Sequence, residues 1–482
     1  MSIAGCSKIN SFAHQSKPNI IVLLADQLGL NHCGYANNDK AITPNIDKLA
    51  SQSMNFSNAV ANTPVCSAFR ASFMTGKYTT SHGMVINELR LNPNQKCLGH
   101  CLSDAGYQTS YIGKWHMYAN ELGNHFDPKN SFVPRGQHRL GFDGYWAAFN
   151  FHHIYYNAYY HTESPEKIFY SPDVYEPDAQ TDLAINWLKQ NSAKPFSMVL
   201  SYGTPHDPWS DDNVPKEYRE KFKDSSLPNP PNYKDQNDKP YADGWASLSP
   251  QQRKELQNWR RNYYAMTTNL DKNIGRILKH LDTNGLAENT IVIFSSDHGE
   301  MFGAQGRRAK NIFYNEACQI PFLVRWPNKI KPGTSNANIS TVDMMPTILG
   351  LANINAPDSA EGMNLAHLAT GNDGPEPECA FMQGTGATAN WDTGHEWRAI
   401  RNQKFTYAKY LVDGKELLFD NVNDPYQINN LAQNPTYKQV LNKFQKLMKQ
   451  KMASLDDTFE KSTYYKENWV DKDRKILKGA KK

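Results

Sequence analysis

Stretches of apolar residues that end abruptly in polar ones are the clearest pattern in this chain. A strand that is buried on both faces shows such a run without the alternation of a half-exposed strand, and parallel sheets are built from strands of this kind. Five stretches fit this description or come close to it: Pro18–Ala25, Tyr107–His116, Pro195–Tyr202, Thr290–Ser296 and Ile320–Pro327. The pattern predicts that these segments form the central strands of one sheet.

Helical patterns lie between these predicted strands. Thr43 is followed by Pro44 at the first helical position and by apolar residues at helical spacing, which indicates a helix start. Further helices are predicted at 176–190, 251–281 and 341–349. Strands that alternate with helices are typical of an α/β fold, so we expect a large, mainly parallel sheet flanked by helices.

The pattern changes in the last quarter of the chain. Gly, Asn, Asp and Pro accumulate at 371–377, and short strand-like segments follow at 397–401, 405–410 and 416–420, before a helix at 435–453. Because 482 residues are too many for one ordinary core, we expect more than one unit. The predicted parts are an N-terminal tether at 1–17, a large domain at 18–372 and a smaller C-terminal α+β subdomain at 373–482 with a short antiparallel sheet.

Two segments of the large domain lack a clear period. Residues 210–249 are rich in Pro, Asn, Asp and Lys, which predicts a long surface insertion. Residues 134–161 are dense in aromatic and histidine side chains, and this composition fits either an aromatic flap or the lining of a sugar-binding pocket. If they line a pocket, the residues expected to bind substrate are Arg135, His138, His152 and His153.

Polar residues follow several predicted strands directly. Asp26 and Gln27 follow the first strand, Lys114 and His116 end the second, and Asp297-His298 follows the strand at 290–296. In open α/β sheets, sites form where the carboxyl ends of strands meet, and oxygen ligands suit a hard cation. Each pair taken alone could equally be an ordinary polar strand terminus.

A cysteine stands four residues before an arginine in Cys66-Ser-Ala-Phe-Arg70, and Thr75-Gly-Lys77 follows. This stretch resembles the signature of the formylglycine-dependent sulfatases, a family within the alkaline phosphatase-like superfamily. The five-residue string alone has little specificity, but the Asp-Gln and Asp-His-Gly-Glu strand ends accompany it in the order that the family shows. The resemblance covers most of the chain and is weakest over 118–175 and 207–250.

The resemblance implies a fold and a mechanism. It implies an alkaline phosphatase-like catalytic domain in which Cys66 is oxidised to formylglycine, whose hydrated aldehyde is the nucleophile. Arg70 would orient this nucleophile, Lys114 and Lys310 would contact the sulfate, and His206 would be the general acid. His116 would help to deprotonate the sulfated intermediate, which then collapses to aldehyde and sulfate. The implied metal ligands are Asp26, Gln27, modified Cys66, Asp297 and His298.

The ligand set leaves the metal and the substrate class open. Oxygen-rich ligation favours Ca2+, with Mn2+ or Mg2+ as alternatives because His298 is a softer ligand. Gln27 and His298 stand where many sulfatases have Asp and Asn, and these variants occur in relatives that cleave phosphodiesters or phosphonate monoesters. We therefore expect a sulfatase acting on an anionic algal or glycosaminoglycan polysaccharide, with a phosphoester or phosphonate hydrolase as the alternative. A non-catalytic sugar-binding protein is a third hypothesis, which the intact set from Asp26 to Lys310 disfavours.

Maturation and location follow from two cysteines. Ala68 stands where many family members have proline, so we expect Cys66 to be oxidised by a maturase that tolerates C-x-A-x-R, such as the bacterial radical enzyme. Met1–Lys8 resembles the end of a bacterial lipoprotein signal with Cys6 as the acylated residue, although the preceding charged and apolar regions are absent. Either the segment is a signal remnant, which would place the protein in the periplasm, on the outer membrane or outside the cell, or the resemblance is accidental.

The composition limits the kinds of binding partner that we expect for this protein. The net charge of +4 comes from interspersed residues and no basic block is present, so we expect no nucleic-acid partner. No run approaches the roughly 18 apolar residues of a membrane span. The seven cysteines are scattered, which does not indicate a disulfide scaffold, and Cys97 and Cys101 are expected to be buried thiols rather than zinc ligands.

Overall fold

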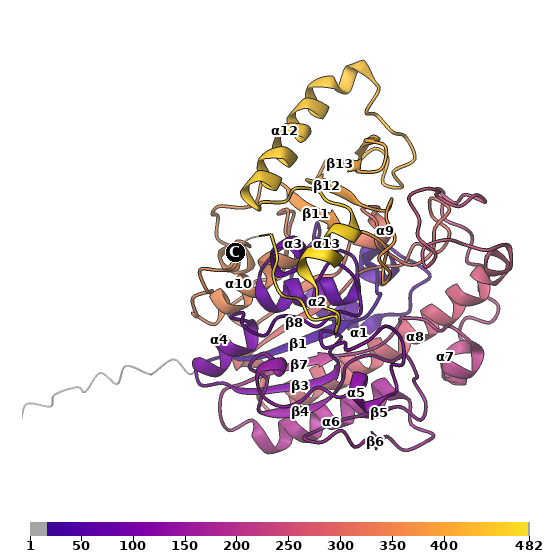
Figure 1. The fold of residues 1–482 in the computed structure, drawn as a ribbon. Coiled ribbons are helices and arrows are strands. Elements are labelled where there is room, and N and C mark those ends of the chain that lie inside the picture. Colours follow the sequence, from indigo (N-terminus) through magenta and orange to yellow (C-terminus); the bar gives the residue numbers. More distant parts are fainter. Residues whose placement is uncertain (1–16, 481–482) are drawn as a thin grey trace, which may run out of the picture.

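The computed structural model describes residues 17–480. Within that range, one large sheet has eight strands, and all neighbouring strands run parallel except those beside β9, which is antiparallel to β2 and β8. Figure 1 shows its central strands stacked one below another. In spatial order the strands are β10 (Gly333–Ser335), β2 (Met54–Phe56), β9 (Phe322–Arg325), β8 (Thr290–Ser296), β1 (Asn19–Ala25), β7 (Phe196–Ser201), β3 (Gln108–Lys114) and β4 (Tyr145–Phe149). The predicted mainly parallel sheet is confirmed.

Helices cover both faces of the large sheet. The even-numbered residues of β1 pack into one core cluster and the odd-numbered residues into another, because successive side chains of a strand point to opposite faces. The first cluster includes residues of α2 (Cys66–Thr75), α4 (Leu98–Asp104) and α10 (Thr341–Leu351). The second includes residues of α1 (Pro44–Ser51), α6 (Glu176–Asn191) and α8 (Pro250–Thr283). Because helices cover both faces of the sheet, the strands appear in the sequence as continuous apolar runs.

The segment at 134–161 contains a strand that the sequence analysis did not predict. Residues Tyr145–Phe149 form β4, which pairs in parallel with β3 at the edge of the sheet. Trp146 is buried there and stacks on Tyr111 of β3 at 5.4 Å between ring centroids. The flanking pieces are short: α5 (Pro128–Ser131), β5 (Tyr159–Tyr160) and β6 (Ile168–Phe169).

The insertion at 210–249 is more buried than its composition indicates. It contains one short helix, α7 (Lys216–Arg219), and it lies on α8. Phe222 is buried and its ring stacks on Tyr264 of α8 at 5.8 Å. Most residues of the predicted surface insertion are exposed or half-buried, but isolated aromatic residues anchor this otherwise polar stretch to the core. The other short helices are α3 (Thr79–His82), α9 (Asn315–Cys318) and α11 (Ala366–Ala369).

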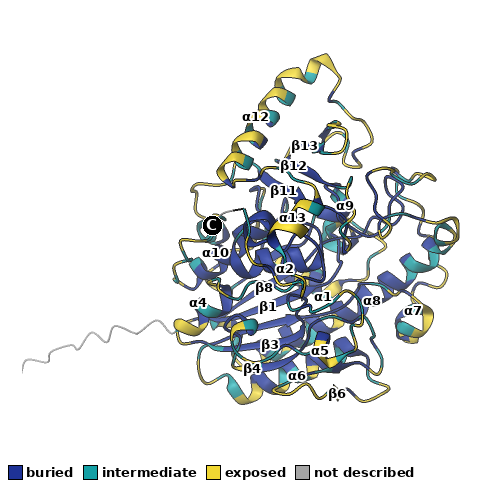
Figure 2. Cartoon of the chain, viewed as in Figure 1, coloured by how far each residue is buried: buried dark blue, intermediate teal, exposed yellow. Residues whose placement is uncertain are grey.

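The C-terminal part forms the predicted antiparallel sheet with one additional strand. Its order is β11 (Ala380–Gly384), β12 (Trp397–Arg401), β13 (Phe405–Tyr410) and β14 (Glu416–Asp420), followed by α12 (Lys438–Ser454) and α13 (Ser462–Trp469). One face packs on the large domain, where Trp397 contacts Phe313 at 5.3 Å. The other face packs on α12, whose outer side is exposed in Figure 2. The sheet therefore joins the large domain to α12.

Three expectations from the sequence concern the cysteines and the membrane. Cys97 and Cys101 are buried free thiols, as expected. None of the helices in residues 17–480 combines the length and the apolar character that a bilayer crossing requires. The predicted N-terminal segment with Cys6 lies outside the described residues.

A buried ion pair fixes the chain after α12 to the C-terminal sheet, and it generates a stability prediction. Arg398 donates from Nε and Nη2 to the two carboxylate oxygens of Asp457 at 2.6 and 2.7 Å, and both side chains are buried. Arg398→Met would leave the Asp457 carboxylate buried without its main partner, so we expect a loss of about 3–5 kcal/mol in the free energy of unfolding. The midpoint of urea unfolding, followed by tryptophan fluorescence, measures this loss.

The control for this prediction is an exposed pair. Lys443 and Glu378 are bridged at 2.8 Å with both side chains more than half exposed, so Lys443→Met should change the free energy of unfolding by less than about 1 kcal/mol. Equal midpoints for the two variants would contradict the prediction.

Candidate active site

Polar residues from four adjacent strands meet at one edge of the large sheet. Asp26 follows β1, Asp297 follows β8, Lys114 ends β3 and His206 lies beyond the end of β7. These four strands are neighbours and run parallel, so their carboxyl ends lie at the same edge. The structure thus brings together residues that lie up to 271 positions apart.

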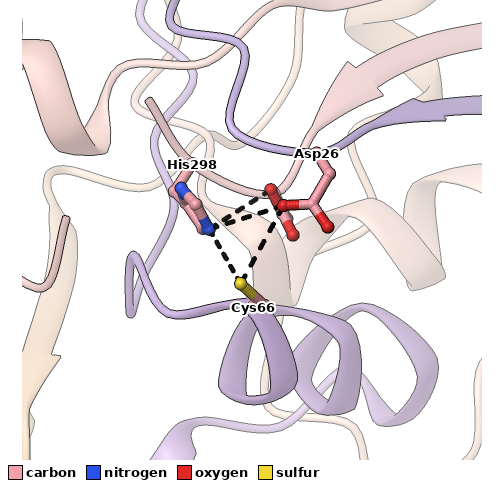
Figure 3. A group of neighbouring side chains, drawn as sticks. Asp26, Cys66 and His298 are labelled. Carbon is pink, nitrogen blue, oxygen red and sulfur yellow. Dashed lines mark hydrogen bonds and ion pairs between the residues drawn. The ribbon is translucent and has the colours of Figure 1, made fainter. Parts of the chain in front are cut away.

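Four potential metal ligands form a compact buried group at this edge. Ligand atoms of Asp26, Cys66, Asp297 and His298 all lie within 4.8 Å of one another. Figure 3 shows Asp26, Cys66 and His298 pointing toward a common centre. The Cys66 Sγ is 3.1 Å from His298 Nε2 and 3.9 Å from Asp26 Oδ1. Two carboxylates and an imidazole fit a divalent cation.

Gln27 lies at the same edge in a constrained position. Its φ of 68° places it in the left-handed region, and its backbone N–H donates to Asp297 Oδ1 at 2.9 Å. Its side-chain oxygen accepts a hydrogen bond from Lys310 at 2.6 Å, and its amide nitrogen donates to Glu300 at 2.7 Å. The predicted ligand Gln27 thus borders the group, and Glu300, which the sequence analysis did not single out, orients its amide.

Cys66 is the first residue of α2 and follows the extended residue Val65. The free N–H groups and dipole at this helix start favour an anion beside Cys66. Burial raises the pKa of the Cys66 thiol to about 11, although Lys114 and Lys310 oppose this shift. The thiol is therefore protonated at neutral pH and is a weak nucleophile as it stands.

Arg70, one turn further along α2, holds the two carboxylates in place. Its Nη2 lies 3.3 Å from Asp26 Oδ2 and 3.3 Å from Asp297 Oδ2. Its Nη1 donates to the backbone oxygen of Lys114 at 2.8 Å and to Ser201 Oγ at 2.7 Å. Burial raises the pKa of Asp26, but the charges of Lys114 and Arg70 outweigh it and hold that pKa well below its ordinary value.

Two lysines and two histidines complete the floor of the site. Lys114 pairs with Asp26 and lies 3.4 Å from His153 Nε2, while Lys310 Nζ lies 2.7 Å from His206 Nε2. The rings of His153 and His206 stack at 3.8 Å with an interplanar angle of 3°. Burial, together with the nearby Lys310 charge, lowers the pKa of His206 well below its ordinary value. His206 is therefore neutral near pH 7 when no anion is bound.

A cavity of about 530 Å³ opens above this floor. Of the predicted site residues, Cys66, His152, His153, His206 and Lys310 line it. Its wall also contains residues that sequence analysis did not predict: Glu88, His125, Arg308 and Asn390, together with Leu122, Phe126 and Trp245, whose side chains are exposed. Trp245 is the one tryptophan within the polar insertion at 210–249. This isolation is the one sequence feature that could have indicated that Trp245 lines a cavity.

The structure does not place Arg135 and His138 in this cavity. Both precede β4, so they lie toward its amino end, whereas His152 and His153 follow β4 at the carboxyl edge where the site is. The Arg135 side chain is exposed and donates to the backbone oxygen of Asp143, and the His138 ring packs on Tyr118 at 4.6 Å. The structure therefore gives no support for the predicted substrate-binding role of these two residues. The prediction grouped them with His152 and His153 because strand β4, which lies between the two pairs, was not recognised in the sequence.

His152 and His116 have defined partners. His152 lines the cavity, but its ring stacks on Phe149 at 3.6 Å and its Nε2 lies 3.1 Å from the backbone oxygen of Tyr159. His116, just beyond β3, is buried with its Nε2 3.1 Å from Glu88 Oε1. His116 therefore contacts Glu88, which lines the cavity.

Comparison with known proteins agrees with this arrangement. A sulfatase family model matches residues 18–354, and a model described as N-sulphoglucosamine sulphohydrolase, C-terminal, matches residues 303–454. An ulvan-active sulfatase of Formosa agariphila is 37% identical over 467 residues, which cover 94% of this chain and 85% of the relative.

Solved structures show the same fold. A 4S-sulfatase structure described with glycosaminoglycan metabolism in Bacteroides thetaiotaomicron has a TM-score of 0.78 and 28% identity, covering 94% of this chain and 98% of that one. A phosphonate monoester hydrolase of Agrobacterium radiobacter has a TM-score of 0.68 at 21% identity, covers 92% of this chain and 96% of that one, and shares the fold alone. The match of the sulfatase model to most of the chain, together with the relative at 37% identity, shows that this protein belongs to the sulfatase family.

Proposed function

We propose that this protein hydrolyses sulfate monoesters on a carbohydrate, using formylglycine at position 66 and one divalent cation. The observation that supports this most strongly is the buried group around position 66, in which two carboxylates and His298 adjoin Arg70, Lys114 and Lys310. Oxyanions are bound where fixed cations and a helix start converge in a site that water leaves.

The residues around position 66 would hold both the metal and the nucleophile. Asp26, Asp297 and His298 would bind the cation, with Gln27 at its border, and Ca2+ suits the carboxylate oxygens. When bound, the cation neutralises sulfate oxygens and formylglycine supplies a hydroxyl nucleophile, two functions that a buried neutral thiol does not provide. Oxidation of Cys66 by a maturase that accepts alanine at position 68 is part of this proposal.

Lys114 and Lys310 would bind the sulfate, and His206 would donate the proton that the departing sugar oxygen requires. In the structure, Lys310 donates toward His206 Nε2 and Gln27. A bound sulfate anion would offer Lys310 an alternative acceptor. Negative charge arriving beside His206 raises its pKa, because an opposite charge favours the protonated ring. The imidazole would then be protonated when substrate is bound and would act as a general acid.

The cavity rim supports a sugar substrate. Trp245, Phe126 and Leu122 are about half exposed and line the mouth of the cavity, and aromatic faces suit the C–H surfaces of a pyranose ring. The relatives named above include an ulvan-active sulfatase and a sulfatase described with glycosaminoglycan metabolism. We therefore propose an oligosaccharide of an anionic algal or glycosaminoglycan polysaccharide as the substrate.

The main test compares ester classes and follows the state of position 66. We expect matured protein to release sulfate from an aryl sulfate at least about 100-fold faster than phosphate or phosphonate from matched aryl esters, and to lose this activity on metal removal. Activity should track the formylglycine fraction determined by peptide mass spectrometry, and Cys66→Ser should bind sulfated substrate without turnover.

Three outcomes would contradict this proposal. Faster release of phosphate or phosphonate would favour the alternative hydrolase class. Full sulfatase activity with Cys66 present only as a thiol would exclude the formylglycine mechanism and leave a metal-activated thiol or water as the nucleophile. Binding without turnover on any ester, in protein that carries formylglycine and metal, would favour a sugar-binding protein.

A second prediction concerns the rim. Trp245→Ala should raise KM for sulfated oligosaccharides about 5- to 10-fold, because a stacking contact contributes on the order of 1 kcal/mol, and should leave KM for an aryl sulfate within about twofold. Phe169→Ala is the control, since Phe169 is also exposed but does not line the cavity. Equal effects of Trp245→Ala on both substrates, or no activity on any sulfated oligosaccharide in a broad panel, would count against the sugar assignment.

A third prediction concerns His206. If it protonates the leaving oxygen, His206→Ala should lower kcat about 10²- to 10⁴-fold for a sugar sulfate, whose alkoxide leaves poorly. For a nitrophenyl sulfate, whose phenolate needs no proton, the loss should be much smaller. Measuring kcat for both substrates with matched formylglycine content provides the test. A uniform loss on both would assign His206 to sulfate binding instead.

A further inference from the structure

Glu88 is a buried carboxylate in the cavity wall and is not one of the proposed cation ligands. Within residues 17–480, no lysine lies at hydrogen-bond distance from it. Its side chain is 4% exposed, and its Oε1 lies 3.1 Å from Nε2 of His116, which is 1% exposed. An isolated carboxylate is costly to bury, so a buried Glu beside a cavity requires a partner or a function. His116 is that partner.

The backbone at both residues adopts an uncommon conformation. Glu88 has a φ of 62° and His116 a φ of 58°, in the left-handed region that residues other than glycine rarely occupy. Such conformations persist only where surrounding contacts impose them, and they gather at functional sites. Glu88 and His116 are two of the residues with this conformation, and they contact each other.

The segment that carries Glu88 is tied to the start of α2. The side-chain oxygen of Asn87 accepts hydrogen bonds from the backbone N–H and the hydroxyl of Ser67, at 3.1 and 2.8 Å. From the other side, Arg474 near the C-terminus donates to the backbone oxygens of Glu88 and Asn87. These contacts fix Glu88 relative to Cys66, which is the residue before Ser67 and lines the same cavity.

The contact between Glu88 and His116 selects one tautomer of the imidazole. When Glu88 is ionised, its carboxylate only accepts hydrogen bonds, so Nε2 carries the hydrogen and Nδ1 keeps its lone pair. His116 Nδ1 is buried and has no hydrogen-bond partner among the described residues. The ring itself packs on Phe151 at 4.3 Å, which restrains its rotation. His116 is thus held as a base whose free atom is Nδ1.

We infer that Glu88 is a positioning residue that fixes the tautomer of His116 and offsets the positive charge that the ring gains when it accepts a proton in the active site. This inference rests on the proposed sulfatase function. In that step, formylglycine at position 66 would supply a hydroxyl, and His116 would accept a proton at Nδ1 while its Nε2 hydrogen stays bonded to Glu88. The arrangement matches the general logic of a base oriented by a carboxylate.

The charged and titratable groups around the pair define its pH dependence. His116 faces Oε1, His125 Nδ1 lies 3.8 Å from Oε2, and Arg474 and Lys114 act on the carboxylate through their charges. Burial raises the pKa of Glu88 to about 7, with Arg474 and Lys114 opposing the shift. Activity that needs the ionised carboxylate therefore rises with pH through this range.

The test uses Glu88→Gln and Glu88→Ala in matured protein with an aryl sulfate as substrate. We expect Glu88→Ala to lower kcat about 10- to 100-fold with KM changed less than about twofold, since a positioning residue acts on the base and not on substrate binding. In Glu88→Gln, the acidic limb of the kcat profile should move to lower pH. In the double variant with His116→Ala, removing Glu88 should cost no further activity.

Three results would overturn the inference. They are an unchanged pH profile in Glu88→Gln, additive losses in the double variant, or a loss that appears mainly in KM, which would assign Oε2 to substrate binding. Glu163→Gln is the control for removing a carboxylate, because Glu163 is half exposed and does not line the cavity. Glu163→Gln should leave kcat, KM and the pH profile unchanged.

A second measurement separates this inference from the proposed function. The ¹⁵N shifts of His116 in the unmodified Cys66 protein report its tautomer without any turnover. We expect the Nε2–H form in the wild type and its loss in Glu88→Ala. If the protein proves to cleave another ester class, this result still tests the pair, whereas an Nδ1–H form in the wild type would overturn the inference whatever the substrate.

Discussion

The burial of two carboxylates at one sheet edge is the constraint on which the rest of the site depends. Asp26 and Asp297 are fully buried, and a buried charge without a partner would destabilise the fold by several kcal/mol. Arg70 lies between them and contacts both. Because Arg70 is on α2, the same ion pairs that satisfy the carboxylates also fix the helix whose first residue is Cys66. Position 66, where we propose the nucleophile, and the candidate metal ligands are therefore placed by one network.

This network extends beyond the large domain. The loop with Asn87 and Glu88 is held between Ser67 of α2 and Arg474 from the end of the chain. Thr388 and Asn390, from the C-terminal subdomain, line the cavity beside residues of the large domain. The small antiparallel sheet is consequently a structural part of the site as well as a support for α12. Because loops of both units line the cavity, its binding surface contains more kinds of side chain than the strand ends alone would provide.

Floor and rim of the cavity differ in their physical character. The floor is charged and rigid, since its lysines and histidines bond to one another and to residues at strand ends. The rim is apolar and exposed at Trp245, Phe126 and Leu122. A rigid charged floor suits a small anion whose shape does not vary, whereas exposed rings suit a larger partner of varied shape. The rim is thus where substrate choice would be made in a family that shares one reaction.

The sequence by itself determined the strands, the helices that cover them and the residues at the strand ends, because each is a local pattern of apolar runs, caps and polar stops. Asp26, Lys114, His206 and Asp297 could be identified in this way, and the parallel order of β1, β3, β7 and β8 then places them at one edge. Strand β4 was missed because its apolar residues stand within a stretch dense in aromatics, and Arg135 and His138 were misplaced with it. Only the tertiary structure decided the cavity wall. Glu88, His125, Trp245 and Arg308 come from loops without a period, and their meeting depends on how those loops pack against one another and not on any pattern within them.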